Sequence, residues 1–205
     1  MTVKSVAILD HGLCNIHSIA RSFEQCGANV SVVTQAKDIC SADRLVLPGV
    51  GAFSATVKIL RAGGYEDAIK EFAKIKERPL LGVCLGMQLL ADTSEEGGME
   101  TGLGLVPGRV VRLNACKGER IPHVGWNEVM LRSQSRLFSD IPNCSDFYFV
   151  HSYKFVCEDN YVIGVTDYCG GFVSAVSLGN VSGVQFHPEK SQGFGRKVLN
   201  NFMLA

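Results

Sequence analysis

Stretches typical of buried β-strands alternate with stretches typical of amphipathic helices over the first ninety residues of the chain. Each expected strand is a short apolar run bounded by Gly, Pro or Asp, a pattern typical of strands covered on both faces. This alternation predicts βαβ units and a parallel sheet, with functional residues at the carboxyl ends of its strands. The expected strands are residues 3–9, 30–33, 44–47 and 80–83, and the expected helices are residues 16–26, 52–61, 65–77 and 85–92.

From residue 104 onward the pattern changes to short strands separated by turns, which indicates antiparallel or mixed pairing. The chain has no repeat, low-complexity tract or long linker. Residues 1–205 are therefore expected to form one α/β domain, with a mostly parallel mixed sheet flanked by helices and a smaller antiparallel section in the C-terminal half. The later strands are expected at 109–113, 127–131, 147–156, 162–166, 172–177 and 181–186, with a hairpin turn at 178–180 and a last helix at 197–203.

The charge balance excludes some classes of partner. The chain has 20 basic and 20 acidic residues, so no net field attracts nucleic acid or a membrane surface, and a small neutral substrate or a protein partner is expected. No apolar run approaches the roughly 20 residues of a membrane span, and no signal peptide is evident, which predicts a cytoplasmic protein. The eight cysteines are expected to be reduced, and no His and Cys spacing indicates a metal site.

The segment Gly82–Gly86 has the form G-x-Cys-x-G and lies between an expected strand and an expected helix. In a nucleophile elbow the reactive side chain lies on a cramped turn, and glycines two residues away avoid clashes. The same turn points the Leu85 N–H and the positive end of the helix at Cys84, which favours a thiolate. Alone, the segment equally fits a buried cysteine between two glycines.

A base and an orienting carboxylate are available in His187-Pro188-Glu189, which follows the expected strand at 181–186. The proline is expected to keep the segment extended, so that the histidine and glutamate side chains lie on the same side. The carboxylate can then fix the imidazole tautomer while the other ring nitrogen faces a thiol. A surface turn exposing both side chains to solvent is the alternative for this pair alone.

Together these segments resemble the class I glutamine amidotransferases over essentially the whole chain, most closely the glutaminase subunits of imidazole glycerol phosphate synthases. The resemblance implies a flavodoxin-like α/β domain. Seven matching segments occur in order: residues 47–53, 82–90, 95–97, 102–105, 122–127, 149–153 and 183–191.

The resemblance implies a Cys-His-Glu triad that hydrolyses glutamine. Cys84 is the expected nucleophile, His187 the acid and base, and Glu189 the group that orients His187. The oxyanion intermediates need two donors, and the matching candidates are the Leu85 N–H and an N–H from the loop at Val50 and Gly51.

The same resemblance assigns the substrate contacts. Gln88 and Glu96 are expected to hold the amino-acid end of glutamine, with Glu96 opposite its ammonium group. The segment His151, Ser152 and Tyr153 is expected to contribute backbone hydrogen bonds. No cofactor and no metal are implied.

In this family the ammonia passes to a partner, a (β/α)8-barrel cyclase docked over the face that carries the cysteine. Asn15, Trp126 and Lys190 are the expected interface residues, although Trp126 also fits a core aromatic. The chain departs from the family pattern after its first strand, where His11 replaces an aromatic residue and Cys14 replaces a glycine. The departure leaves the triad untouched and bears on the identity of the partner.

Three other functions fit parts of the sequence. A paralogous glutaminase could feed a different synthetase, for example one that amidates a surface-polysaccharide sugar. The same triad could serve a cysteine peptidase or related hydrolase that acts without a partner. A catalytically silent regulatory subunit is a further alternative, against which the intact Cys84, His187 and Glu189 argue.

Overall fold

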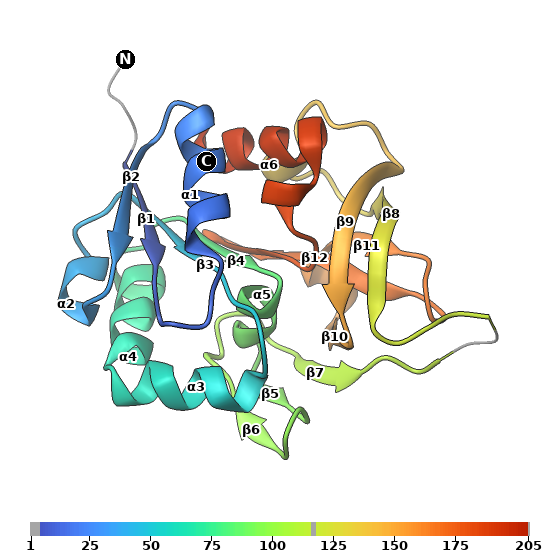
Figure 1. The fold of residues 1–205 in the computed structure, drawn as a ribbon, viewed down its shortest axis with the longest axis horizontal. Coiled ribbons are helices and arrows are strands. Elements are labelled where there is room, and N and C mark those ends of the chain that lie inside the picture. The colour runs from blue at the N-terminus through green and yellow to red at the C-terminus, as the bar shows by residue number, and fades with distance from the viewer. Residues whose placement is uncertain (1–4, 116–117, 205) are drawn as a thin grey trace.

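The computed structural model describes residues 5–115 and 118–204, and its centre is a five-stranded parallel sheet (Figure 1). The strand order is β2-β1-β3-β4-β13, and neighbouring strands in this part are all parallel. This order is that of a flavodoxin-like doubly wound sheet, in which ligands bind at the carboxyl ends of the strands. The strands are β1 (Ser5–Leu9), β2 (Asn29–Val33), β3 (Arg44–Leu47), β4 (Leu80–Val83) and β13 (Val181–Val184).

Helices cover both faces of this sheet, as Figure 1 shows with α1 and α6 on one side and α3, α4 and α5 on the other. The strand residues alternate between the two layers: Val6 and Ile8 belong to the core under α1 and α6, whereas Ala7 and Leu9 belong to the core under α3 and α5. The helices are α1 (Ile16–Gln25), α2 (Ala36–Ile39), α3 (Phe53–Ala62), α4 (Tyr65–Lys70), α5 (Leu85–Leu89) and α6 (Gln192–Leu204).

The sheet continues beyond β13 with mainly antiparallel strands. β12 (Phe172–Leu178) pairs with β13 through the tight turn at Gly179 and Asn180, which confirms the expected hairpin. Beyond it the order is β10-β7-β5-β6, in which only β5 and β7 are parallel. These strands are β5 (Thr93–Ser94), β6 (Glu100–Thr101), β7 (Arg109–Arg112) and β10 (Tyr153–Val156).

A long antiparallel ribbon branches from β12 and is visible in yellow and orange in Figure 1. β11 (Val162–Thr166) pairs with β12 and with β8 (His123–Leu131), and β8 pairs along its length with β9 (Ser145–His151). The partners Val124 and Val150 lie opposite each other in this ribbon. Short 3₁₀ turns lie at Arg136–Phe138, Asp159–Tyr161 and Pro188–Lys190.

The expected fold class is confirmed, and the differences are local. β8 begins four residues earlier than expected, and the strand expected at 147–156 is interrupted at Ser152 between β9 and β10. The helix expected at 65–77 passes from α4 into a π-helical turn at Glu71–Ile75. α2, β5 and β6 were not expected, because elements this short leave little periodicity. Residues 3 and 4 of the first expected strand, and Cys116, lie outside the described residues.

Candidate active site

The turn at Cys84 is a strained strand-to-helix elbow. Cys84 has φ 55° and ψ −111°, an unusual conformation for a residue with a side chain. A Cβ on Gly82 would lie 2.6 Å from the Gly86 carbonyl oxygen, and a Cβ on Gly86 would overlap the Leu47 carbonyl oxygen. Both glycines are therefore required for the helix to leave the sheet at this angle.

The Cys84 thiol is almost completely buried, with 6% of the residue exposed. Its Sγ lies 3.7 Å from the Val150 carbonyl oxygen, which can accept the thiol proton, and 3.8 Å from Nε2 of Gln185. His187 also interacts with the thiol, from the segment that follows β13. β4 and β13 are hydrogen-bonded neighbours, so the topology brings Cys84 and His187 together at adjacent strand ends.

His187 and Glu189 form a buried hydrogen-bonded pair, with Nδ1 2.8 Å from Oε1 and both side chains less than 10% exposed. Burial alone would lower the pKa of His187. Hydrogen bonding and charge attraction to Cys84 and Glu189 outweigh burial and raise that pKa to about 10. The site therefore favours an imidazolium beside the sulfur.

The expected extended shape of His187-Pro188-Glu189 is wrong, although the hydrogen bond forms. Pro188 begins a short 3₁₀ turn, and His187 is the extended residue that precedes it. Proline is tolerated at the first position of a helical turn because its missing N–H would have no partner there. The main chain of His187 is fixed by its N–H donating to the Tyr148 carbonyl at 2.9 Å and by Ser191 Oγ donating to its carbonyl at 2.6 Å.

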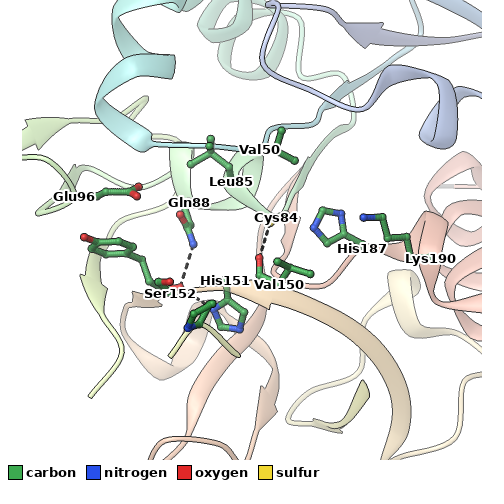
Figure 2. A pocket seen from close by; sticks show the side chains of 13 residues that line it. Val50, Cys84, Leu85, Gln88, Glu96, Val150, His151, Ser152, His187 and Lys190 are labelled. Carbon is green, nitrogen blue, oxygen red and sulfur yellow. Dashed lines mark hydrogen bonds between the residues drawn. The ribbon is translucent and has the colours of Figure 1, made fainter. Parts of the chain in front are cut away.

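Most of the candidate site residues line one pocket of about 290 Å³ (Figure 2). Glu189 lies behind His187, outside this lining, and Asn15 lines a small neighbouring cavity that also touches His187 and Glu189. Pro122 and Val150 line the pocket without having been expected there. The lining residues are Val50, Gly51, Cys84, Leu85, Gln88, Glu96, Pro122, Val150, His151, Ser152, Tyr153, His187 and Lys190.

The two expected oxyanion donors differ in availability. Leu85 is the first residue of α5, so its N–H has no acceptor within the helix and faces the region of Cys84. The Val50 N–H instead donates to the Leu13 carbonyl at 3.0 Å. In this conformation Val50 does not offer its N–H to the pocket.

The loop after β1 fixes that arrangement through His11. The buried His11 ring has Nε2 2.9 Å from the Pro48 carbonyl oxygen, and its Nδ1 accepts from the Leu13 N–H at 3.4 Å. Since a carbonyl only accepts, Nε2 is the donor in this contact. The residue that departs from the family pattern therefore fastens the loop at residues 10–13 to the candidate oxyanion loop.

Glu96 and Gln88 face the pocket with acceptor oxygens available. Glu96 Oε2 accepts from the Phe53 N–H at 2.8 Å, which leaves its second oxygen for a ligand. Burial raises the pKa of Glu96, and the Phe53 hydrogen bond opposes that shift. Gln88 uses its Nε2 as a donor to the Tyr153 carbonyl at 3.1 Å, so its Oε1 remains an acceptor for a ligand N–H.

His151 lines the pocket as a neutral side chain. Its Nδ1 donates to the Tyr153 carbonyl at 2.9 Å, and its Nε2 accepts from Nδ1 of the buried His123 at 3.0 Å. Burial lowers the pKa of His151 to about 3. These bonds hold the bend between β9 and β10, where the expected backbone contacts would lie. His123 was not singled out from the sequence.

The outer face of the ribbon carries exposed apolar side chains: Val124 pairs with the pocket residue Val150, and Trp126 lines a separate hollow with residues of α6. Trp126 is 47% exposed and Val124 is 56% exposed, so Trp126 is not a core aromatic. The Trp126 ring lies edge to face with Tyr148, and the Lys190 ammonium lies 5.8 Å from the centre of the Tyr148 ring. The three expected interface residues are all exposed.

Among residues 5–115 and 118–204, no three His, Cys, Asp or Glu side chains are grouped so that they could hold a metal ion. In the same part of the chain, no helix has the length and hydropathy needed to cross a bilayer.

A doubly wound α/β sheet with a cysteine on a strained elbow and a histidine–glutamate pair beside it defines a class of enzymes that use a thiol nucleophile. Within that class, residues 7–205 match the family described as Glutamine amidotransferase class-I. The chain belongs to the class-I glutamine amidotransferase family.

Two relatives agree with this assignment, and a solved structure shares the fold. The chain is 45% identical over 201 residues to the imidazole glycerol phosphate synthase subunit HisH of Moorella thermoacetica, covering 98% of this chain and 94% of that protein. It is 41% identical to the chloroplastic imidazole glycerol phosphate synthase hisHF of Arabidopsis thaliana, covering 97% of this chain and 34% of that protein. The structure of PurLQS from Thermotoga maritima superposes with a TM-score of 0.77 at 18% identity, covering 99% of this chain and 98% of that one.

Proposed function

We propose that this protein hydrolyses glutamine to glutamate and ammonia, with Cys84 as the nucleophile. The observation that carries this proposal is the single pocket in which Cys84 and His187 lie beside Gln88 and Glu96. The pocket thus combines a nucleophile and its base with acceptors suited to the ammonium group of an amino acid.

The proposed reaction proceeds through a thioester. The Cys84 thiolate forms a C–S bond to the side-chain amide carbon of glutamine, and the C–N bond breaks as His187 gives its proton to the leaving ammonia. His187 then takes a proton from water, whose oxygen forms a C–O bond to the thioester carbon; the C–S bond breaks, which releases glutamate and regenerates the Cys84 thiolate beside the protonated His187. The pair with Glu189 supports the imidazolium at the start of this sequence.

The negative oxygen formed at each attack needs donors, and removal of one donor typically costs about 100- to 1000-fold in rate. The Leu85 N–H is the donor at the start of α5. A second donor from Val50 requires release of its bond to Leu13. We infer that the conformation described is less active than one in which that bond is open.

We further propose that the ammonia serves imidazole glycerol phosphate synthesis, in the histidine pathway, through a (β/α)8-barrel cyclase. The names of the relatives from Moorella and Arabidopsis support this pathway. The exposed Val124 and Trp126 on the ribbon supply an apolar surface on which the cyclase would dock.

Reconstitution with a histidine-pathway cyclase tests both proposals. We expect glutamate release from glutamine by this chain alone, a rise in that rate on addition of the cyclase, and a complex on size exclusion. A cyclase that neither binds nor raises the rate contradicts the pathway, while a response to a different synthetase indicates the paralogous function. Turnover of peptides without glutamine hydrolysis contradicts the proposed glutaminase function.

Substitution of Glu189 by glutamine tests the pair with His187. The variant keeps the size and an acceptor oxygen but loses the charge, so kcat for glutamine should fall by at least about 100-fold. An unpaired histidine has a pKa of 6.5, whereas that of His187 is raised to about 10. Loss of Glu189 lowers this pKa, so the alkaline decline in kcat/KM should move to lower pH.

The raised pKa of His187 also determines how the His187–Glu189 pair affects the free energy of unfolding as the pH changes. The pair contributes fully to the free energy of unfolding below pH 6.5, and the contribution is lost as the pH rises through about 10. Rate and denaturation profiles against pH, with the exposed Glu158→Gln as control, measure both effects. An alkaline limb that does not move in Glu189→Gln contradicts this role.

A further inference from the structure

A buried glutamine next to the nucleophile has no place in the triad. Gln185 follows β13 directly, is 0% exposed, and has its Nε2 3.8 Å from Cys84 Sγ. Its main-chain N–H donates to the Ser174 carbonyl at 2.9 Å, which fixes the backbone from which the side chain extends. A buried carboxamide is retained in an apolar strand end only when its polar atoms are satisfied.

The hydrogen-bond network determines which Gln185 atom faces the sulfur. The Tyr153 carbonyl can only accept, so the Gln88 atom 3.1 Å from it is the amide nitrogen. The same nitrogen lies 2.9 Å from Gln185, whose facing atom must then be the acceptor Oε1. The Gln185 amide nitrogen is left to point at Cys84 Sγ. Reversing either amide would place two donors or two acceptors against each other.

The sulfur therefore has a different neighbour for each protonation state. The Val150 carbonyl at 3.7 Å can accept a hydrogen bond from the thiol, but it cannot donate a hydrogen bond to a thiolate. The Gln185 amide at 3.8 Å donates to the sulfur and favours the thiolate. Unlike His187, an amide donor cannot lose its proton, so its contribution to the thiolate does not depend on the protonation state of His187.

Building on the proposed glutaminase function, we propose that Gln185 is a further catalytic residue, whose carboxamide N–H, held in place by Gln88, stabilises the Cys84 thiolate before it attacks the substrate. The described titratable and charged groups that line the pocket with Cys84 are His187, with Glu189 behind it, His151, Tyr153, Glu96 and Lys190. None of these residues is changed in the test below.

The test measures the thiolate directly. The full-length chain is treated with iodoacetamide at a series of pH values, and alkylation of Cys84 is followed by mass spectrometry of its peptide. Gln185→Leu removes the donor at similar volume, and Gln185→Met removes it with an unbranched, uncharged side chain of similar length. Ser182→Ala, earlier on β13 and outside the pocket, is the matched control.

Loss of a hydrogen-bond donor to a charged group typically changes the equilibrium constant of that group's ionisation by about 10- to 100-fold. We expect the pH midpoint of Cys84 alkylation to rise by about one unit or more in both Gln185 variants, with a matching 10- to 100-fold fall in kcat for glutamine and no change in Ser182→Ala. If Gln185→Leu does not fold, Gln185→Met decides. A folded Gln185 variant with the wild-type alkylation midpoint overturns the proposal. Alkylation requires no glutamine, so wild-type protein that alkylates as expected but hydrolyses no glutamine contradicts the glutaminase function alone.

Discussion

Replacement of Cys84 by alanine is expected to reduce glutamine hydrolysis by a factor on the order of 10⁴ or more, with or without a partner subunit. No other described side chain in the pocket can form the thioester, and loss of a nucleophile removes the covalent route as a unit. The fold should survive, because alanine occupies the same backbone conformation with a smaller side chain. Glutamate release measured in a coupled assay gives the rate, and circular dichroism checks the fold.

The matched control for Cys84 is Cys40→Ala. Cys40 is a half-buried thiol whose Sγ contacts the Ala68 carbonyl at 3.9 Å, on the α4 side of the sheet and outside the pocket. Its substitution should leave the rate within about twofold, as expected for a site without a role in the reaction. Ammonia production that is unchanged in Cys84→Ala would make the thiol dispensable and restore the silent-subunit alternative.

The second large effect is expected for Gly86→Ala, and it concerns stability. The added methyl group would overlap the Leu47 carbonyl oxygen, which belongs to the buried strand β3 and cannot move without displacing the sheet. We expect the free energy of unfolding to fall by at least about 3 kcal/mol, at the upper end of overpacking costs, or no folded protein. Urea denaturation followed by circular dichroism measures this change.

Gly193→Ala provides the comparison for Gly86→Ala. Gly193 lies in α6, and a Cβ there meets no atom within 4 Å. Alanine should leave the stability unchanged or raise it by up to about 1 kcal/mol, because alanine is the better helix former. Equal effects of the two substitutions would show that the elbow tolerates a side chain at residue 86.

The parts of the site that could be predicted are those with a local sequence signature. Cys84 was found because the backbone conformation of its turn requires glycine on both sides, so the constraint is visible within five residues. His187 and Glu189 directly follow an apolar strand, but the pair alone also fitted a surface turn, and the resemblance to the family made them the expected partners of Cys84. Their proximity to Cys84 follows from the topology, since β4 and β13 are neighbours in the parallel sheet.

The parts that could not be predicted depend on contacts between distant segments. Gln185 resembles any polar residue at a strand end, and only its contacts with Gln88 and Cys84 distinguish it. The bond between the Val50 N–H and the Leu13 carbonyl joins two loops 37 residues apart and has no signature in either loop. The break at Ser152 likewise depends on how His151 and Tyr153 bond across the bend.

His11 and Leu13 hold the loop at residues 10–13 against the loop at Pro48 and Val50. Substitutions in this region differ in kind from substitutions at the triad. Under the proposed mechanism, substitutions at the triad alter the chemistry itself, whereas substitutions in the loop at residues 10–13 are expected to alter how readily the Val50 N–H is released from Leu13. We therefore expect residues that do not line the pocket to adjust the rate of glutamine hydrolysis in small steps. Such a loop can diverge between relatives while the reaction stays the same.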